Sequence, residues 1–279
     1  MVALEGFISD ITERKKIEEE LIRARDKAEQ SDRLKTAFLH NISHEIRTPM
    51  NAIVGFTTLL DAPDITDESR RQYIDIIYQS SNQLLSIITD IVDISNIETG
   101  QVKVSRTSIN LNTMIRHLHD QYRVRAQQQG LLLNFTTHLD DKEAMVLTDE
   151  TKIIQIFSNL LNNALRFTRQ GQIELGYVVR GETVEFFVSD TGIGIAPEHQ
   201  QKVFERFFQV EGPSSKQYSG TGLGLSISKA YAELLGGTIW LRSTPGEGSL
   251  FCFSIPCLKV GELKAATKMA SLKSTENKP

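Results

Sequence analysis

The sequence predicts two structural classes in one chain, a helical N-terminal part and an α/β C-terminal part. Three observations lead to this prediction. Up to Gly100, apolar residues recur every three or four positions, which is the spacing of one helix face. The polar stretch DAPDITDES, which contains a proline, divides this part in two. After Gly100, short runs of β-forming residues alternate with helical stretches, as in an α/β domain.

The first elements are expected to be long helices. Residues 13–37 are rich in Glu, Lys and Arg and show heptad spacing, so we expect a coiled-coil linker helix. The apolar stripe continues from Phe38 to Leu60 and returns from Tyr73 to Ile94. Residues 38–100 should therefore form an antiparallel helical hairpin. One hairpin cannot cover its own apolar stripe, so two copies are expected to pair into a four-helix bundle.

The C-terminal part, residues 101–258, contains short β-like runs separated by helical stretches near 111–128, 149–168 and 222–235. The β-like runs are QVKVS, LLLNFTT, AMVLT, GQIELGYVV, TVEFFVS, GTIWLRS and SLFCFSI. This pattern favours helices packed on one face of a mixed sheet. The tail, 259–279, is polar and Lys-rich, and we expect it to be flexible.

Composition narrows the classes of function. The chain has 279 residues, 40% of them hydrophobic, and a formal net charge of -4, so no basic face points to nucleic acid. Its 2 cysteines lack metal-ligand spacing and indicate a reducing compartment. No apolar run approaches the ~20 residues of a membrane helix. We therefore expect a cytoplasmic location, with membrane attachment only if a longer native chain supplies it.

The segment FLHNISHEIRTPMNAI places reactive groups in the middle of the first hairpin helix. His44 lies two residues after Ile42, so it should point away from the apolar stripe into solvent. Glu45 follows it and can accept the proton of one ring nitrogen while the other nitrogen attacks an electrophile. Pro49 has no N–H and is expected to bend the helix beside this pair.

Two motifs begin with the same residues. HEIRT starts like the zinc motif H-E-x-x-H, but Thr48 stands where the second histidine is needed, which excludes a metalloprotease site. The longer stretch SHEIRTPMNAI resembles the phosphoacceptor box of bacterial sensor histidine kinases. This resemblance implies that His44 is phosphorylated and that Glu45 acts as its base. It also implies that Thr48 orients a water that dephosphorylates a response regulator.

The helix expected at 149–168 carries three asparagines, which are poor residues inside helices. Asn159, Asn163 and Arg166 fall on the polar stripe opposite the apolar face. Asn carbonyl oxygens suit Mg²⁺, which usually keeps waters and nucleotide phosphates as its other ligands. Because residues that break local rules often cluster at sites, a functional role is favoured for this stripe.

Two glycine-rich turns follow this helix. In VEFFVSDTGIGI a β-like run ends at Asp190, and Gly192 and Gly194 let the backbone turn tightly beside a ligand. An ionised Asp only accepts hydrogen bonds, so Asp190 can read the exocyclic amine of adenine. In SGTGLGLSISKAY, alternating glycines open a helix whose N-terminus can bind phosphates.

In this order, the segments resemble the asparagine, DxGxG, phenylalanine-rich (FERFFQ) and GxGxG boxes of the histidine-kinase ATP-binding domain. The resemblance implies an Hsp90-like ATPase fold, an α/β sandwich, that binds ATP and Mg²⁺, with Asn163 as the metal ligand. Arg166 stands where the family usually has Lys, and its planar fork differs from a point charge. The implied nucleotide-binding residues are Asn159, Asn163, Arg166, Asp190, Gly192, Gly194, Gly220, Thr221, Gly222, Leu223 and Gly224.

The resemblance implies a complete reaction sequence. A homodimer would phosphorylate His44 from ATP and pass the phosphoryl group to an Asp of a response regulator receiver domain. The start FISDITERKKIEEEL resembles the closing strand and exit helix of a PAS sensor domain, with residues 1–12 as its remnant. Two alternatives remain open. One is a conformational ATPase of the Hsp90-like superfamily, which would not need SHEIRTP. The other is an inactive dimeric scaffold, supported only by Arg166.

Overall fold

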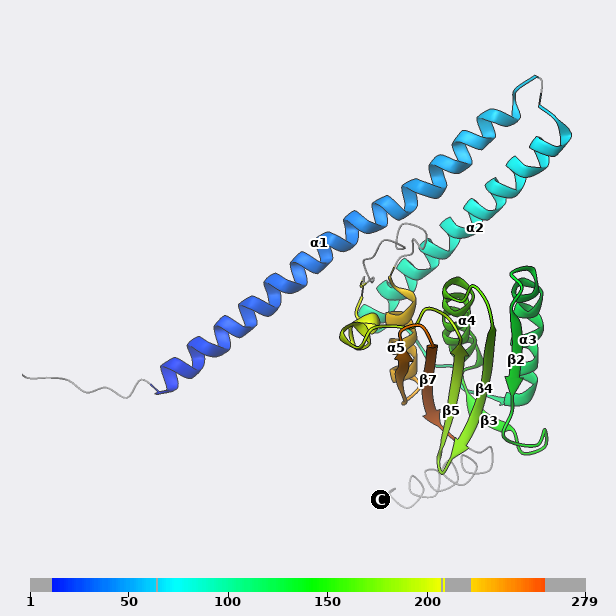
Figure 1. Ribbon diagram of the computed structural model, residues 1–279. Coiled ribbons are helices and arrows are strands. Elements are labelled where there is room, and N and C mark those ends of the chain that lie inside the picture. The colour runs from blue at the N-terminus through cyan, green and yellow to red at the C-terminus, as the bar shows by residue number, and fades with distance from the viewer. Residues whose placement is uncertain (1–11, 64, 207, 209–221, 259–279) are drawn as a thin grey trace, which may run out of the picture. The chain divides into compact units, whose positions relative to one another are not determined.

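The computed structural model describes residues 12–63, 65–206, 208 and 222–258 (Figure 1). The chain divides into two compact units, Met1–Leu84 and Leu85–Pro279. The predicted remnant at 1–12, apart from its last residue, and the predicted flexible tail lie outside the described residues. The predicted domain boundary after residue 100 stays a prediction, and the boundary between the compact units falls earlier, inside the second helix.

Two long helices form the predicted hairpin. Helix α1 (Thr12–Leu60) includes both the expected linker helix and the first hairpin helix, and it continues through Pro49. Helix α2 (Asp67–Glu98) begins after Thr66, whose hydroxyl accepts a hydrogen bond from the Ser69 N–H at 3.2 Å. The rings of Phe56 and Tyr73 pack across the hairpin, with centroids 5.3 Å apart. No helix within the described ranges is both long enough and apolar enough to cross a membrane.

The second unit contains an α/β domain with a mixed sheet. Its helices are α3 (Leu111–Gln128), α4 (Glu150–Phe167) and α5 (Gly224–Leu234). Its strands are β1 (Thr107–Asn110), β2 (Leu132–Thr136), β3 (Met145–Thr148), β4 (Gln172–Arg180), β5 (Thr183–Asp190), β6 (Thr238–Thr244) and β7 (Gly248–Pro256). Five strands pair in the order β2-β4-β5-β7-β6, and only the β2–β4 pair is parallel. Strands β1 and β3 form a separate antiparallel pair.

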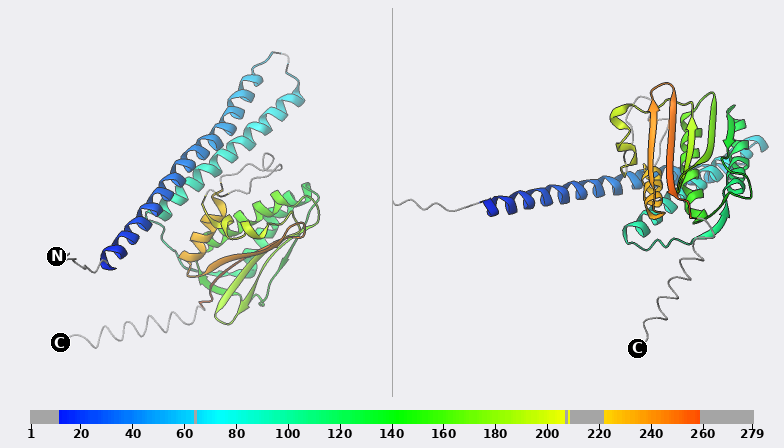
Figure 2. Two further views of the ribbon diagram at one scale, coloured as in Figure 1. Left: turned by 60° about the vertical axis from the view of Figure 1, so that its left-hand side comes forward. Right: turned by 90° about the horizontal axis from the view of Figure 1, so that it is seen from below.

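Helices α3, α4 and α5 cover one face of the five-stranded sheet (Figure 1, Figure 2). The core between the layers contains Phe157 of α4, Phe186 of β5 and Phe253 of β7, each 0% exposed. The rings of Phe186 and Phe253 stack at 4.8 Å, and Phe157 meets both edge-on, an arrangement that aromatic quadrupoles favour. Side chains alternate along β5, so Asp190, its last residue, faces the same helix-covered side as Phe186.

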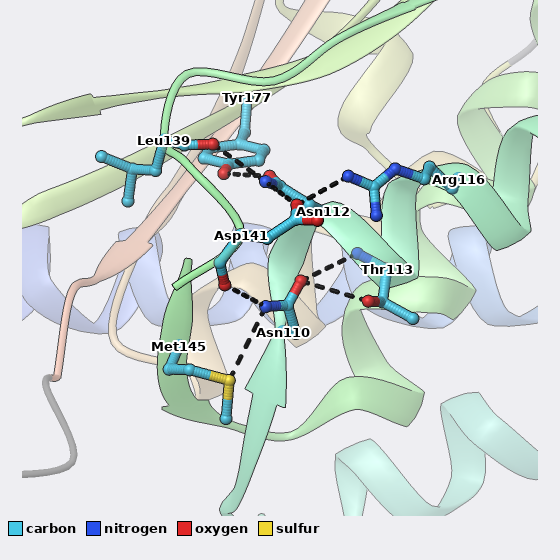
Figure 3. A network of polar contacts seen from close by, with 8 residues as sticks. All are labelled: Asn110, Asn112, Thr113, Arg116, Leu139, Asp141, Met145 and Tyr177. Carbon is cyan, nitrogen blue, oxygen red and sulfur yellow. Dashed lines mark hydrogen bonds and ion pairs between the residues drawn. The ribbon is translucent and has the colours of Figure 1, made fainter. Parts of the chain in front are cut away.

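A polar network anchors the start of α3 to the sheet and to a neighbouring loop (Figure 3). Asn110 caps the helix by accepting a hydrogen bond from the Thr113 N–H at 3.0 Å. The buried Tyr177 hydroxyl donates to Asn112 at 2.5 Å, and the Asn112 amide donates to Asp141 at 2.7 Å. Burial raises the pKa of Tyr177. These groups satisfy one another, so the network holds the fold together and is not part of the candidate site.

One predicted strand is wrong. Residues 101–105, QVKVS, form no strand, and the strand of this region is β1, which pairs with β3. The backbone N–H of Ser105 donates instead to the carboxylate of Asp149 at 2.8 Å. Alternating β-branched residues favour a strand only where a partner strand lies alongside, and here a side chain supplies the hydrogen bond.

Candidate functional site

His44 lies on the exposed side of α1, as predicted. Ile42 and Ile46 are half-buried, and the Thr48 hydroxyl donates to the carbonyl oxygen of His44 at 3.2 Å. Since Pro49 has no N–H, the Glu45 carbonyl loses its usual helical partner. The imidazole is open to solvent, and the Thr48 hydroxyl, which donates to the helix backbone, can still accept a hydrogen bond through its oxygen.

Helix α4 positions the asparagine stripe. Asp149 caps the helix, because its carboxylate accepts from the Lys152 N–H at 3.2 Å and from the Thr151 hydroxyl at 2.5 Å. Burial opposes the ionisation of Asp149, but the hydrogen bonds from Thr151, Ser105 and Lys152 outweigh it and hold its pKa below the usual value. The buried face of the helix leaves the asparagines on the other side, and it consists of Ile153, Ile156, Phe157, Leu160, Leu161, Ala164 and Leu165.

Asn159 joins the asparagine helix to the second glycine turn. Its amide donates to the Gly224 carbonyl at 3.0 Å and to the Ser228 hydroxyl at 3.3 Å. A Cβ atom at Gly224 would lie 3.4 Å from the Asn159 side chain, which is an ordinary van der Waals contact. Two predicted site segments, 65 residues apart in sequence, are thus brought together. The amide protons of Asn159 are used within the protein, which makes it a residue that positions the glycine turn.

Asp190 is the buried acceptor of the site. The residue is 8% exposed, and its carboxylate accepts from the Gly192 N–H at 2.8 Å. Burial raises the pKa of Asp190, and hydrogen bonds from the backbone N–H groups of Gly192 and Ser249 oppose that rise. A carboxylate has about four acceptor positions, so these two bonds leave room for a ligand that donates.

The glycines beside Asp190 are required by space and backbone conformation. A Cβ atom at Gly192 would lie 2.6 Å from the Phe167 carbonyl oxygen and 2.7 Å from an Asp190 carboxylate oxygen. Gly194 has φ +69°, and a Cβ there would lie 2.0 Å from the Thr244 carbonyl oxygen. The turn therefore packs tightly against the end of α4 and the end of β6, which holds Asp190 in a fixed place.

Two serines complete this region, and sequence reasoning missed both. Ser249 of β7 lies opposite Asp190 in the sheet register. Its hydroxyl lies 3.0 Å from that of Ser243 on β6, which accepts from the Ile195 N–H at 2.7 Å. Only strand pairing brings these residues to the glycine turn, and no local motif marks them.

The second glycine turn is described in part. Gly222 has φ +67°, which favours glycine, and Gly224 is the first residue of α5. The N-cap residue of α5, Leu223, supplies no side-chain cap, so among the described residues the helix N-terminus has no side-chain hydrogen bond from its cap. Leu223 as a whole is 0% exposed, so it belongs to the core and anchors the start of α5. Gly220 and Thr221 lie outside the described residues.

Asn163 and Arg166 occupy the last turns of α4, and both are half-buried. The Arg166 guanidinium lies 5.4 Å from the centroid of the Phe167 ring, within the range of a cation–π contact.

The phenylalanine-rich box is described in part. Its Phe204 packs edge-on to Phe251 at 6.4 Å, and Phe207 and Gln209 lie outside the described residues. Among the described residues, α4 links the two glycine segments: the Phe167 carbonyl accepts from the Ile193 N–H at 3.3 Å, and Asn159 donates to Gly224 at 3.0 Å.

Two family models match the chain. Residues 34–100 match the His Kinase A (phospho-acceptor) domain. Residues 148–259 match the family described as histidine kinase-, DNA gyrase B-, and HSP90-like ATPase. The second match covers α4, the sequence of both glycine turns and every strand of the five-stranded sheet except β2.

Relatives and solved structures agree with these matches. The virulence sensor protein BvgS of Bordetella bronchiseptica is 39% identical over 99% of this chain and 23% of its own length. Full-length ShkA in complex with AMPPNP is similar at a TM-score of 0.60 and 28% identity, over 80% of this chain and 46% of that one. Histidine kinase ThkA in complex with the response regulator TrrA is similar at a TM-score of 0.59 and 28% identity. The similarity covers 90% of this chain and 68% of that one.

The chain spans only 23% of the length of BvgS. Within that span it has both domains that the two family models describe, the phospho-acceptor domain and the ATPase domain. The chain belongs to the bacterial sensor histidine kinases of two-component systems.

Proposed function

We propose that this chain is the catalytic core of its kinase. It transfers the γ-phosphoryl group of ATP to His44 and then passes it to an aspartate of a response regulator. The observation that carries the nucleotide part is Asp190, a buried acceptor fixed by Gly192 with acceptor positions to spare. An acceptor-only group at the bottom of a site suits the exocyclic amine of adenine. The complex of the similar kinase ShkA with AMPPNP supports a nucleotide of this type.

The transfer to His44 follows from its exposure. One imidazole nitrogen forms a bond to the γ-phosphorus while the bond from that phosphorus to the bridging oxygen breaks, and ADP leaves. Glu45, the next residue, accepts the proton from the other ring nitrogen. Most of the rate enhancement comes from positioning and charge neutralisation, as in phosphoryl transfer generally.

The α4 stripe fits one protein ligand for Mg²⁺. Mg²⁺ prefers oxygen ligands and keeps several waters and phosphate oxygens, so a single amide oxygen from Asn163 is sufficient. The Asn159 amide nitrogen donates to Gly224 and Ser228, which assigns this residue to holding the start of α5. When bound, Mg²⁺ would neutralise charge on the phosphates. Arg166 and the α5 N-terminus would hold the phosphate chain from the protein side.

A homodimer is supported by apolar residues that a single chain leaves exposed. They recur at heptad-like steps along α2, each at least 46% exposed: Ile74, Tyr78, Leu85, Ile88 and Val92. Helix α1 adds Met50, Val54 and Leu59. A second hairpin would bury these residues in a four-helix bundle. Sedimentation equilibrium should show a dimer, and Tyr78→Glu with Leu85→Glu should shift it to monomer. Gln79→Glu is the matched control and should remain dimeric.

The response regulator is the proposed acceptor of the phosphoryl group. ThkA, which is similar over 90% of this chain, was solved in complex with its response regulator, and this supports a receiver domain as partner. Thr48 is proposed to orient the water that later removes the phosphate from that partner. Its hydroxyl proton is donated to the His44 carbonyl, so its lone pairs can accept from a water.

Radiolabelling with [γ-³²P]ATP tests the kinase directly. Wild-type protein should gain a label that acid removes and alkali preserves, as expected of a phosphoramidate. His44→Gln should lose the label and still bind ATP, whereas His40→Gln on the same helix should keep most of it. ATP hydrolysis with no histidine label would favour the conformational ATPase instead. Neither hydrolysis nor label would favour the inactive scaffold.

A further inference from the structure

Thr168, which ends α4, has a buried hydroxyl without a partner. The residue is 3% exposed, and no described residue is hydrogen-bonded to its Oγ1 atom. Its backbone N–H donates to the Ala164 carbonyl at 3.0 Å, so the backbone itself is satisfied. Of the buried side-chain polar atoms in the described part of the chain, only this oxygen and the Nδ1 atom of His199 lack a partner. An unpaired buried hydroxyl destabilises the fold, so it calls for an explanation.

The position of Thr168 relates it to the acceptor of the site. It follows Leu161, Ala164 and Leu165 at helical spacing, so it extends the face of α4 that packs on the sheet. The preceding residue, Phe167, accepts a hydrogen bond through its carbonyl from the Ile193 N–H at 3.3 Å.

The same carbonyl defines how closely the two segments approach. A Cβ atom at Gly192 would lie 2.6 Å from the Phe167 oxygen and 2.7 Å from an Asp190 carboxylate oxygen. The end of α4 and the Asp190 turn are therefore in direct contact. Thr168 follows Phe167 directly, and in the sheet register Ile173, Asp190 and Ser249 lie side by side.

We propose that the bound nucleotide completes the hydrogen bonding of Thr168: its hydroxyl donates to the N1 atom of adenine, directly or through one water. This inference rests on the proposed function, because it assigns a specificity-determining residue to the same nucleotide site. The edge of adenine presents a donor, the 6-amine, beside an acceptor, N1. Asp190 can only accept and a hydroxyl can donate, so the pair matches that edge in order.

Guanine presents the opposite order. Its O6 is an acceptor, which the Asp190 carboxylate repels, and its N1 carries a hydrogen. The pairing of Asp190 with Thr168 therefore selects adenine over guanine through hydrogen bonds, in a place where an apolar pocket would discriminate weakly.

The test uses two variants that differ only in the hydroxyl or the methyl group. Thr168→Val keeps the shape and removes the hydroxyl, whereas Thr168→Ser keeps the hydroxyl. Without nucleotide, the Val variant should melt at the same temperature as wild type or higher, because it removes an unpaired polar group. Its affinity for ATP should fall roughly tenfold, the usual effect of one hydrogen bond, and the Ser variant should stay within about threefold of wild type.

A nucleotide analogue identifies the atom involved. In 1-deaza-ATP a C–H group replaces N1, so wild type should bind it roughly tenfold more weakly than ATP. The Val variant should bind both equally, because the two changes remove one shared interaction. Equal penalties for the analogue in both proteins would overturn the proposal, as would a Val variant that melts lower and binds ATP like wild type. Failure of the wild type to bind ATP would instead refute the proposed function itself.

Discussion

The substitution Asp190→Asn separates nucleotide binding from folding. It replaces a buried carboxylate by an amide of the same size. The carboxylate accepts from the N–H groups of Gly192 and Ser249. Asn keeps one acceptor oxygen, but its amide nitrogen is a donor. That nitrogen must face another donor, either a backbone N–H or the amine of adenine.

The expected loss of affinity follows from these contacts. Losing a charged hydrogen bond costs about 1.5–3 kcal/mol, and a donor left without an acceptor costs about 1–3 kcal/mol more. We expect about 3–4 kcal/mol in total, which weakens ATP binding by about 10²–10³-fold.

The folding stability of Asp190→Asn, unlike its affinity for ATP, should rise or hardly change. Burial raises the pKa of Asp190, so the stability that its protonated form contributes is lost as the pH rises through that raised pKa. At pH 7 the folded protein bears the burial of a charge that Asn does not carry. The free energy of unfolding of the variant should therefore lie within about 1 kcal/mol of wild type or above it.

Calorimetric titration measures the affinity for ATP. Urea unfolding without ATP measures the free energy of unfolding. Asp141→Asn is the matched control, since it makes the same chemical change at an exposed carboxylate that belongs to the α3 network. The control should bind ATP like wild type. Unchanged ATP affinity in Asp190→Asn would remove this residue from the site, and a loss of several kcal/mol in stability would refute the reasoning from burial.

Three further predictions follow from the geometry. Thr48→Ala should leave labelling of His44 near the wild-type level but slow regulator dephosphorylation, measured as loss of phosphate from a labelled regulator. Gly194→Ala should abolish ATP binding, because a Cβ would lie 2.0 Å from the Thr244 carbonyl oxygen. The φ of +69° also disfavours L-residues there by about 1–2 kcal/mol. An ATP affinity equal to that of wild type, measured by calorimetry, would contradict this prediction. Asp149→Ala should lower the free energy of unfolding by about 1–2 kcal/mol at pH 7. Because folding lowers the pKa of Asp149, that difference should shrink as the pH falls below about 4, and urea unfolding at several pH values checks it.

Periodicity and residue type alone predicted most of the elements. The helices near 111–128 and 149–168 match α3 and α4, and the mixed sheet under helices is confirmed. The exposure of His44 followed from its spacing to Ile42, and the choice of Asp190 as an acceptor followed from its place at the end of a β-like run, whereas its burial came from the structure. These properties are local, because the repeat of a helix or strand and the chemistry of a side chain depend on nearby residues.

Only the tertiary structure decided which side chains are hydrogen-bonded to one another. Sequence reasoning placed Asn159 near the metal, and only the fold shows that its amide nitrogen donates to Gly224 and Ser228. Ser249 reaches Asp190 only through the register of β5 with β7, and the unpaired hydroxyl of Thr168 is visible only once the core around it is packed. The strand predicted at QVKVS does not form for the same reason: the Ser105 N–H donates to the Asp149 carboxylate and not to a neighbouring strand. Hydrogen-bond partners far apart in the sequence are chosen by strand register and by how closely helices approach, and neither is encoded in a local pattern.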